Sequence, residues 1–457
     1  MTRLGAAVAL WLALQVSVAA WVQHHDPQRA IAPDTESYER SALALLVDGR
    51  FWTAPGSREP EVHRTPGYPA LIAASYAVFG RHPAVVIGIQ ILMNGMILTL
   101  VVRMAWRAGV AAAWAAVVVL GLDVVFFANA QYLLTETLFT FQLVSFVCLW
   151  TEMCRSRADR SRQLGLAAVS SVVLATMALT RPIAYYLPAL AAVVTVLVAR
   201  RDGETHRRAL ASAVLVLLPA VVLLGAWQVR NLRVSGSAEF SQIKNVNLFR
   251  YRAAGVVALR DGISFEAAQA RVLREIETRY PHLEGIRFLE AAGAEGRRIV
   301  RAEPWLAMRT VAAGFARMML APGENALLHV VGVDQPAGPA GDLLRVDLPT
   351  FLRTWVIGRP GEFLFFAFAS VHLVVTYGLA LVAFWGWSSQ TRAARTLVVA
   401  AAFLTGYLVL LASGPEAYPR FRTPIAPLLA ILAGVGYHRL SSVWVRGSGR
   451  GRPGLPY

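Results

Sequence analysis

Blocks of apolar residues long enough to cross a lipid bilayer recur along the 457-residue sequence. A transmembrane helix needs about 20 predominantly apolar residues, and about ten segments approach that length. These segments are Leu4–Val22, Ala84–Val102, Val110–Phe127, Tyr132–Trp150, Leu164–Leu179, Ile183–Val198, Leu210–Trp227, Phe363–Trp387, Thr396–Leu411 and Pro424–Tyr437. Hydrophobic residues make up 56% of the chain and charged residues only 16%, whereas a soluble domain has roughly 25% charged residues. The sequence therefore predicts an all-α, polytopic membrane protein with about ten transmembrane helices.

Positive charge is concentrated in alternate connections between these segments. Lys and Arg number 44 against 28 Asp and Glu, but the excess lies in short arginine clusters rather than on one surface, which argues against a nucleic-acid partner. The clusters are Arg103 with Arg107, Arg155 to Arg162, Arg200 to Arg208, Arg392 with Arg395, and the tail from Arg439. Because cytoplasmic connections carry excess Lys and Arg, both termini are expected in the cytoplasm, in a multi-pass protein of the plasma (inner) membrane.

The first span is the one segment with a second interpretation. Leu4–Val22 follows Arg3 and is long enough to span, so we expect it to be retained as a helix. A cleavage site at Ser17-Val18-Ala19 would make it a signal peptide instead.

This topology divides the chain into four regions. Residues 1–227 form an N-terminal transmembrane region whose first outer loop, 23–81, is expected to carry the catalytic residues. Residues 228–360 form a long, mainly helical loop on the same outer, periplasmic or extracellular, side. Residues 361–441 supply the C-terminal transmembrane helices, and 442–457 form a basic cytoplasmic tail.

Three outer segments have helical patterns. Tyr68–Phe79 is apolar but too short to span, which predicts a helix lying in the membrane interface. Phe265–Thr278 and Pro304–Leu320 predict helices in the long loop. Ser264 is an expected N-cap, and Glu266 is favourable in the first turn that follows.

The first outer loop contains an acid and an arginine suited to chemistry. If Asp34 opens a helix, Tyr38 lies one turn later on the same face, and such a carboxylate could act as a general base. The alternative is an N-cap aspartate in a solvated loop. Arg64, followed by Pro66, places a cation suited to a phosphate where the chain re-enters the interface. Its alternative is an arginine that snorkels towards lipid headgroups.

Further charged residues fall at the same outer face. Glu136 lies in the first turns of a span, where a carboxylate costs roughly 2–3 kcal/mol at the bilayer centre, so it is a functional candidate unless it only pairs with Arg181. Arg181 precedes a helix-breaking proline, and Arg420 and Arg422 lie in the last outer loop. Together with Asp34, these residues suit an anionic lipid headgroup better than a transmembrane pathway.

The order of several short motifs resembles that of the GT-C membrane glycosyltransferases. The nearest branches are the protein O-mannosyltransferase-like and lipid A aminoarabinose transferase-like enzymes. The resemblance runs from the N-terminus through the last span and is weakest in the long outer loop. The motifs are Asp34-x-x-x-Tyr38, Arg64-Thr65-Pro66-Gly67-Tyr68-Pro69 ending in Phe79-Gly80, Leu134-Thr135-Glu136-Thr137-Leu138-Phe139, Thr180-Arg181-Pro182, Trp227-Gln228-Val229-Arg230-Asn231 and Arg420-Phe421-Arg422-Thr423-Pro424.

The resemblance implies a cell-envelope hexosyl- or pentosyltransferase that takes its sugar from a polyprenyl phosphate. Asp34 would deprotonate the acceptor, which is a protein, lipid or polysaccharide hydroxyl, and in-line attack would invert the anomeric centre. The family often has Lys or His where this chain has Arg64, which keeps the phosphate contact but cannot donate a proton. The expected site comprises catalytic Asp34 and Glu136, phosphate-binding Arg64, Arg181, Arg420 and Arg422, and supporting Tyr38, Glu36 and Tyr68.

Three other interpretations and one question about metals accompany this expectation. Family members generally need no metal, and no cofactor is expected beyond the lipid-linked donor, although the spacing of Asp34 and Glu36 leaves a divalent metal open. A flippase or transporter of lipid-linked sugars would need ionisable residues deep in several spans. A surface-polysaccharide polymerase or ligase would share the lipid-linked substrate, and a membrane scaffold would need no converging acids and arginines.

Overall fold

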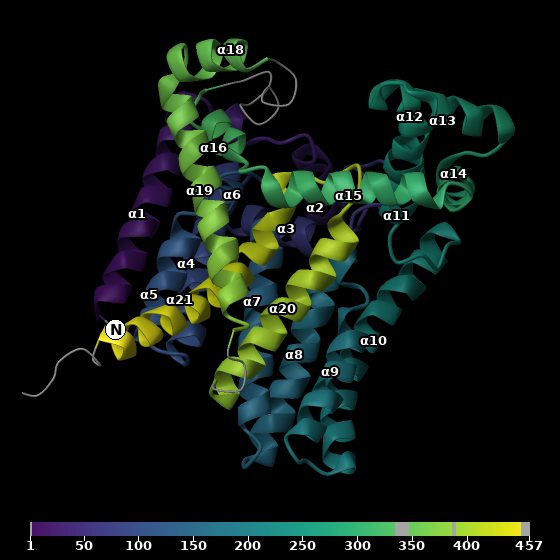
Figure 1. Ribbon diagram of the computed structural model, residues 1–457. Helices are drawn as coiled ribbons and strands as arrows, with labels where there is room; N and C mark the ends of the chain where they lie inside the picture. The colour runs from purple at the N-terminus through teal and green to yellow at the C-terminus, as the bar shows by residue number, and fades with distance from the viewer. Residues whose placement is uncertain (1, 334–346, 386–389, 449–457) are drawn as a thin grey trace, which may run out of the picture.

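The computed structural model describes residues 2–333, 347–385 and 390–448, which are helical apart from turns, loops and one isolated bridge (Figure 1). Within these residues, eight helices are long and apolar enough to cross a membrane. They are α1 (Thr2–His25), α4 (Pro83–Trp106), α7 (Glu136–Arg155), α8 (Arg160–Thr180), α9 (Leu187–Arg201) with the preceding 3-10 turn η2 (Pro182–Ala184), α10 (His206–Ser235), α19 (Pro360–Val382) and α20 (Arg392–Ala412). The all-α class is confirmed, and the chain is a multi-pass membrane protein. The end of the predicted span 363–387, residues 334–346 of the long loop and residues 449–457 of the tail lie outside the described residues.

The predicted span 110–127 is not one continuous helix. It is divided into α5 (Val110–Gly121) and α6 (Val124–Asn129). Asp123 separates them because its side chain accepts a hydrogen bond from the backbone N–H of Phe126, at 2.8 Å, and so caps α6. Every residue from 123 to 140 is buried, so the turn that leads from α6 to α7 runs inside the protein.

Amide side chains from the spanning helices satisfy the backbone of this buried turn. Gln90 of α4 donates to the carbonyls of Ala130, at 3.1 Å, and Tyr132, at 2.7 Å. Asn94 of α4 and Gln15 of α1 donate to carbonyls within α6. Irregular backbone is tolerated at membrane depth only where the protein itself supplies such partners, since lipid offers none. These amides therefore hold in place the turn from which α7 and Glu136 begin.

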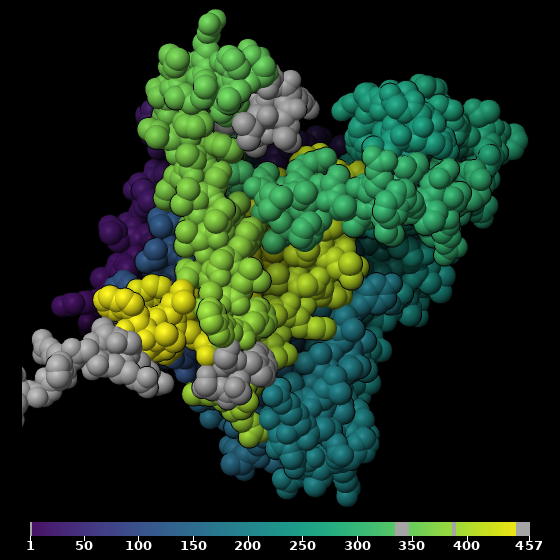
Figure 2. All heavy atoms as spheres, in the orientation of Figure 1, coloured from purple at the N-terminus to yellow at the C-terminus, as the bar shows by residue number. Residues whose placement is uncertain are grey.

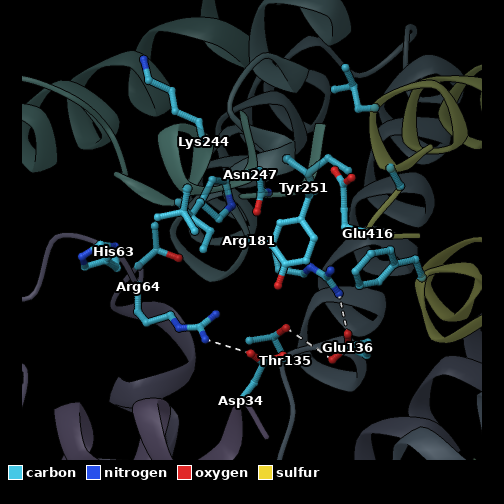
Figure 3. A pocket seen from close by; sticks show the side chains of 18 of the residues that line it. Asp34, His63, Arg64, Thr135, Glu136, Arg181, Lys244, Asn247, Tyr251 and Glu416 are labelled. Carbon is cyan, nitrogen blue, oxygen red and sulfur yellow. Dashed lines mark hydrogen bonds and ion pairs between the residues drawn. The ribbon is translucent and has the colours of Figure 1, made fainter. Parts of the chain in front are cut away.

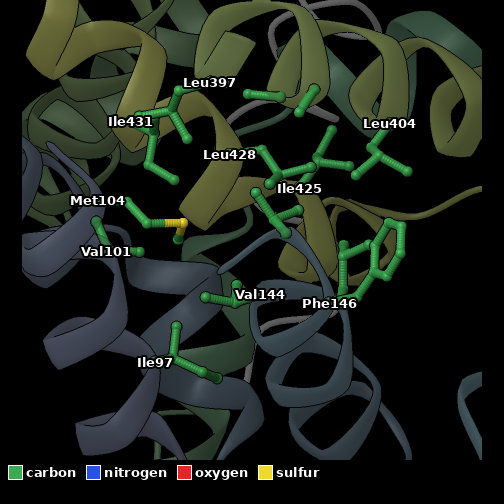
Figure 4. Close-up of a cluster of buried hydrophobic side chains, with 14 of the residues drawn as sticks. Ile97, Val101, Met104, Val144, Phe146, Leu397, Leu404, Ile425, Leu428 and Ile431 are labelled. Atoms are coloured by element: carbon green, nitrogen blue, oxygen red, sulfur yellow. The ribbon is translucent and has the colours of Figure 1, made fainter. Parts of the chain in front are cut away.

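The core of the bundle lies where four helices meet (Figure 4). Helix α21 (Ala426–Ser448) continues from the 3-10 helix η6 (Pro419–Ile425) and packs between α5, α19 and α20. Its Gly434 and Gly436 approach the backbone of α5 and α19 directly, as small residues do between membrane helices. The side chains drawn from α4, α7, α20, η6 and α21 include Ile97, Val101, Met104, Val144, Phe146, Leu397, Leu404, Ile425, Leu428 and Ile431.

Two sets of helices lie beyond one end of this bundle. The first outer loop forms α2 (Thr35–Asp48) and α3 (Gly67–Phe79). The long loop forms α11 (Ile243–Val246), the π-helix η3 (Asn247–Ala253), α12 (Ala254–Asp261), α13 (Phe265–Arg279), α14 (Gly285–Ala302), α15 (Pro304–Leu320), α16 (Glu324–Val330), α18 (Leu348–Phe351) and the π-helix η4 (Leu352–Ile357). Figure 2 shows α12 to α14 standing apart from α18 and α19, with α15 running between the two groups.

The two helices predicted within the long loop are confirmed. Helix α15 has the predicted bounds, and α13 extends one residue beyond its predicted end. The Ser264 hydroxyl accepts a hydrogen bond from the N–H of Ala267, at 3.1 Å, as expected of an N-cap. Helices α12, α13 and α14 also share a small apolar core, which includes Val256, Val272 and Ile299. This part of the loop therefore packs against itself as well as against the bundle.

Removing the amide of Gln90 tests whether it stabilises the buried turn. In Gln90→Leu the carbonyls of Ala130 and Tyr132 lose their donor at similar side-chain volume, so we expect the free energy of unfolding to fall by about 2 kcal/mol or more. Thermal unfolding of the purified protein in detergent measures the change. Thr99→Val is the control on the same helix, because that hydroxyl bonds only to the carbonyl of Gly95 one turn away. Equal unfolding temperatures for both variants would contradict the assigned role.

Candidate active site

A cavity of about 780 Å³ lies where the first loop, the ends of α8 and α20, η6 and η3 meet (Figure 3). Its charged side chains come from five parts of the chain: the first loop, the start of α7, the end of α8, α11 with η3, and the last outer turn with η6. Six of the nine predicted site residues line the cavity: Asp34, Tyr38, Arg64, Glu136, Arg181 and Arg420. The structure therefore brings together both predicted catalytic acids and three of the four arginines that the sequence assigned to phosphate.

Asp34 is held by two arginines rather than by the helix that follows it. It occupies the N-cap position of α2, but its side chain makes no capping hydrogen bond. Its Oδ1 lies 2.9 Å from an Nη of Arg64, and its Oδ2 lies 2.7 Å from an Nη of Arg420. The interpretation of Asp34 as a simple N-cap is therefore wrong, because its carboxylate points into the cavity and bridges two guanidiniums.

Arg64 is positioned by a set of hydrogen bonds within the first loop. Its Nε donates to the hydroxyl of Ser37 at 3.0 Å, and one Nη donates to the hydroxyl of Tyr38 at 3.1 Å. Its guanidinium also lies over the ring of Tyr38, 4.6 Å from the ring centre. The buried carboxylate of Glu61 accepts hydrogen bonds from the backbone N–H groups of His63 and Arg64, at 2.7 and 2.9 Å. Arg64 is thus fixed in the cavity and does not extend freely towards lipid.

The first loop docks onto the end of α8, which brings Arg64 and Arg181 to the same cavity. The hydroxyl of Thr65 donates to the carbonyl of Thr180 at 3.1 Å. A Cβ atom on Gly67 would lie 2.6 Å from the Thr180 side chain and 2.8 Å from the carbonyl oxygen of Leu179. Glycine is therefore required at this close approach, which gives a physical reason for the Pro66-Gly67-Tyr68 motif.

Glu136 joins a second group of ion pairs in the same cavity. It is the first residue of α7 and only 2% exposed. Its Oε1 lies 3.0 Å from an Nη of Arg181 and 3.8 Å from the Nε of Arg420. The guanidiniums of Arg181 and Arg420 also lie over the ring of Phe421, each at 5.4 Å. Arg420 thus stands between the two acids, and Glu136 does pair with Arg181, as the alternative interpretation proposed.

The arginines determine the ionisation of Asp34. Burial alone would raise the pKa of the Asp34 carboxyl, but Arg420 and Arg64 outweigh this effect and hold the pKa below its usual value. Asp34 is therefore ionised at neutral pH but is a weak base while both guanidiniums remain in place. Burial raises the pKa of Tyr38, so its hydroxyl stays protonated.

The placement of Arg422 corrects its predicted role as a phosphate ligand. Arg422 is 1% exposed and does not line the cavity. Its guanidinium donates to the carbonyls of Met318, Ala321 and Pro322, at 2.8 to 2.9 Å. Residues two apart on a 3-10 helix point in different directions, so Arg420 faces the cavity while Arg422 fastens the end of α15 to η6.

Two predicted supporting residues also lie outside the cavity lining. Glu36 is exposed on the other face of α2 and lies 3.5 Å from Arg40, one turn away, so its predicted support of the site is not seen. Tyr68 is fully buried, and its hydroxyl donates to Gln90 at 2.7 Å. Its ring packs edge-on against Tyr38, with ring centres 5.3 Å apart. Tyr68 therefore supports the site only through Tyr38.

The long loop contributes cavity residues that sequence reasoning missed. Lys244, Asn247 and Tyr251 reach the cavity from α11 and η3, and Figure 3 shows the ring of Tyr251 projecting towards Thr135 and the acids. No hydrophobic period in the sequence marks a π-helix, so nothing there indicated this approach. Glu416 also lines the cavity. It was identifiable in principle, since it is the one acid in the short outer turn that precedes the Arg420 motif.

The motif Trp227 to Asn231 positions the first loop from outside the cavity. Arg230 donates to the carbonyls of Phe51, at 2.7 Å, and Glu61, at 2.8 Å. Its guanidinium lies 4.9 Å from the ring centre of Trp227. Asn231 in turn donates to the carbonyl of Glu239, at 2.9 Å. The end of α10 thus fixes the loop that carries Asp34 and Arg64.

Two observations bear on whether Asp34 and Glu36 could bind a divalent metal. Glu36 points away from Asp34, so these acids do not converge as their spacing in sequence allowed. Across residues 2–333, 347–385 and 390–448, no group of three or more His, Cys, Asp or Glu is arranged to hold a metal ion. The expectation that no metal is needed stays a prediction.

Comparison with known proteins yields matches in structure alone. No family model and no curated protein sequence matches this chain. The apo oligosaccharyltransferase of Archaeoglobus fulgidus matches 99% of this chain and 52% of its own length, with a TM-score of 0.52 and 12% identity. AglB, an oligosaccharyltransferase of the same organism in complex with an inhibitory peptide and a dolichol-phosphate, matches 98% of this chain and 52% of its own, with a TM-score of 0.49 and 12% identity. ArnT from Cupriavidus metallidurans, bound to undecaprenyl phosphate, matches 97% of this chain and 79% of its own, with a TM-score of 0.42 and 15% identity.

The match to the apo oligosaccharyltransferase, with its TM-score of 0.52, shows the fold of this chain. The chain is a membrane protein that shares its fold with this oligosaccharyltransferase, a GT-C enzyme, and the motifs had predicted that fold. It spans about half the length of the oligosaccharyltransferase structures that it matches.

The contrast between Arg420 and Arg422 gives a direct test of the site geometry. In Arg422→Gln three buried carbonyls lose a charged donor, so we expect the free energy of unfolding to fall by about 2 kcal/mol or more. Arg420→Gln should unfold closer to wild type and keep only a measurable fraction of the activity, because its side chain faces the cavity. Thermal unfolding and turnover of both variants in detergent separate the roles, and a reversed pattern would contradict the assignment.

Proposed function

We propose that this chain transfers a sugar from a polyprenyl-phosphate donor to an acceptor hydroxyl at the outer face of the plasma membrane. The observation that carries the proposal is the meeting of Asp34 and Glu136 with Arg64, Arg181 and Arg420 in one cavity. A base and a phosphate-binding group are the two functions that such a transfer requires of a protein.

The three arginines suit a lipid-linked phosphate. A guanidinium offers paired N–H donors that match phosphate oxygens, and it stays charged at any physiological pH. Arg64, Arg181 and Arg420 each contact a carboxylate in the cavity. The carboxylates hold the arginines in place, and the donor phosphate would compete with them for the same N–H groups.

The proposed reaction is a single displacement at the anomeric carbon. Asp34 takes the proton of the acceptor hydroxyl while the acceptor oxygen bonds to that carbon from the face opposite the phosphate. The bond between the anomeric carbon and the phosphate oxygen breaks, and its electron pair leaves with the polyprenyl phosphate. The arginines stabilise the charge that develops there, since Arg64 cannot supply a proton. Attack from the opposite face inverts the anomeric configuration.

Donor binding would also strengthen the base. Arg64 and Arg420 hold the pKa of Asp34 low while they contact it. A phosphate that draws these guanidiniums away weakens that effect and raises the pKa, so the carboxylate accepts a proton more readily. Glu136 would keep Arg181 oriented throughout, because its carboxylate is buried and lies 3.0 Å from that guanidinium. The base would therefore reach full strength only when a donor occupies the cavity.

Two further observations support the proposal. The fold is shared with an oligosaccharyltransferase, which is consistent with transfer from a lipid-linked sugar. The arginine-rich connections, including those from α7 to α8 and from α9 to α10, lie at the other end of the bundle from α2 and η6 (Figure 1). The positive-inside rule then favours an outer location for the cavity, with both termini in the cytoplasm.

Loss of the Asp34 carboxylate is the first test. In cells that lack this protein, a polyprenyl-phosphate sugar should accumulate, and wild type but not Asp34→Asn should clear it, as followed by mass spectrometry of the lipid extract. Glu36→Gln is the matched control, because that acid lies two residues away on the same helix but is exposed and outside the cavity. Clearance by Asp34→Asn at normal expression would overturn the mechanism. A purified product that keeps the anomeric configuration of the donor would also rule out single displacement.

The pH dependence of the reaction tests the link between Arg420 and Asp34. A carboxylate base works only above its pKa, so activity is lost as the pH falls through that value. Arg420→Gln removes the cation that most lowers the pKa of Asp34, so the pKa rises and the acid limb of kcat/KM moves to higher pH. Arg40→Gln, an exposed arginine that pairs with Glu36, should leave the limb where it is. An unmoved limb in Arg420→Gln would disprove the coupling.

A further inference from the structure

A second cavity, of about 360 Å³, lies between the C-terminal end of α9 and the N-terminal end of α20. Arginines dominate its polar lining: Arg201, Arg392 and Arg395, with Asp202 as the one acid. Val198 and Val399 supply an apolar part of the wall. The cavity thus combines a cationic rim with an apolar surface, which is the chemistry of a lipid headgroup joined to its chains.

This cavity lies at the opposite end of the helices from Asp34. Helix α20 runs from Arg392, at the second cavity, to Leu411, which lines the first. At 1.5 Å per residue these positions lie roughly 28 Å apart along the helix, close to the thickness of the hydrocarbon core. The second cavity is therefore separate from the candidate active site and lies at the level of the headgroups of the other leaflet.

Its positive charge is not balanced by the protein. Asp202 already accepts from Arg392, at 2.8 Å, and from Arg157, which also pairs with Glu204 at 2.8 Å. Within residues 2–333, 347–385 and 390–448, the guanidiniums of Arg201 and Arg395 have no ion-pair or hydrogen-bond partner. A concave site whose cations outnumber its acids favours the binding of an anion from outside.

We propose that this cavity binds the phosphate of an anionic lipid. The guanidiniums of Arg201 and Arg395 would contact the phosphate oxygens, which suit their paired donors. The first turn of α20 adds the partial positive charge of a helix N-terminus on the same side. The valines would contact the glycerol and the first methylenes of the chains. Basic pockets between transmembrane helices recognise lipid headgroups in this manner.

The proposed lipid site at Arg201 and Arg395 does not depend on the proposed reaction. It would, however, affect how α9 and α20 are held together. It would join α9 and α20, whose other ends also border the candidate active site at Tyr186 and Leu411. A lipid held here would therefore brace, from the opposite leaflet, two helices that form walls of the Asp34 cavity.

The experiment measures lipid binding to the full-length protein in an uncharged detergent. The probes are short-chain phosphatidylglycerol, short-chain phosphatidylcholine and inorganic phosphate, each titrated by native mass spectrometry and by thermal shift. The test variant is R201Q/R395Q. The control is R200Q/R207Q, which removes the same charge from two exposed arginines outside the cavity on the same side of the bundle. R201Q alone replaces the test variant if the double variant does not fold.

We expect phosphatidylglycerol to bind wild type and the control alike, and R201Q/R395Q at least about tenfold more weakly. Phosphatidylcholine should bind all three proteins weakly. Equal weakening in the control, or none in the test variant, would overturn the site. Inorganic phosphate that displaces phosphatidylglycerol at similar concentration would show that the site takes a soluble phosphate and would overturn the lipid assignment.

Discussion

The ion pairs that join two acids to three arginines are the interaction on which the functional end of this protein depends. Asp34, Arg64, Glu136, Arg181 and Arg420 come from four segments that lie apart in the sequence. A buried charge without a partner is far more costly than a buried pair, so each of these side chains limits where the others can lie. The first loop, the ends of α7 and α8, and the last outer turn are consequently held to one geometry, which the fold around them accommodates.

The fold holds this charge cluster in place with polar side chains inside its apolar bundle. The buried turn before α7 stays irregular because Gln90 and its neighbours supply the donors that lipid lacks. As a result α7 begins with Glu136 inside the protein, at a helix N-terminus whose partial positive charge favours a carboxylate. The two ends of the bundle then differ in a simple way. One end pairs its arginines with acids inside a cavity, whereas the other leaves Arg201 and Arg395 available.

Much of this arrangement was predictable because lipid imposes strict rules on sequence. Spanning length and arginine placement indicated the helices, and motif order indicated which ends would carry Asp34, Arg64 and Glu136. The predictions that failed, for Arg422 and Glu36, depended on where a side chain points rather than on where its residue lies in the sequence. Sequence cannot show that η6 is a 3-10 helix, so it could not separate Arg420 from Arg422, nor could it show that Glu36 faces outwards. Contacts made by the long loop, such as those of Tyr251, depend on distant packing that no local pattern encodes.

The two arginines that contact Asp34 lie far apart in the sequence, and this separation has a consequence for biosynthesis. Arg64 follows Asp34 by 30 residues, whereas Arg420 follows it by 386. During synthesis the acid can therefore find its first partner almost at once, but its second emerges only after nearly all the membrane helices have been made. A chain halted before the last outer turn would insert and yet keep an incomplete charge cluster at the membrane surface.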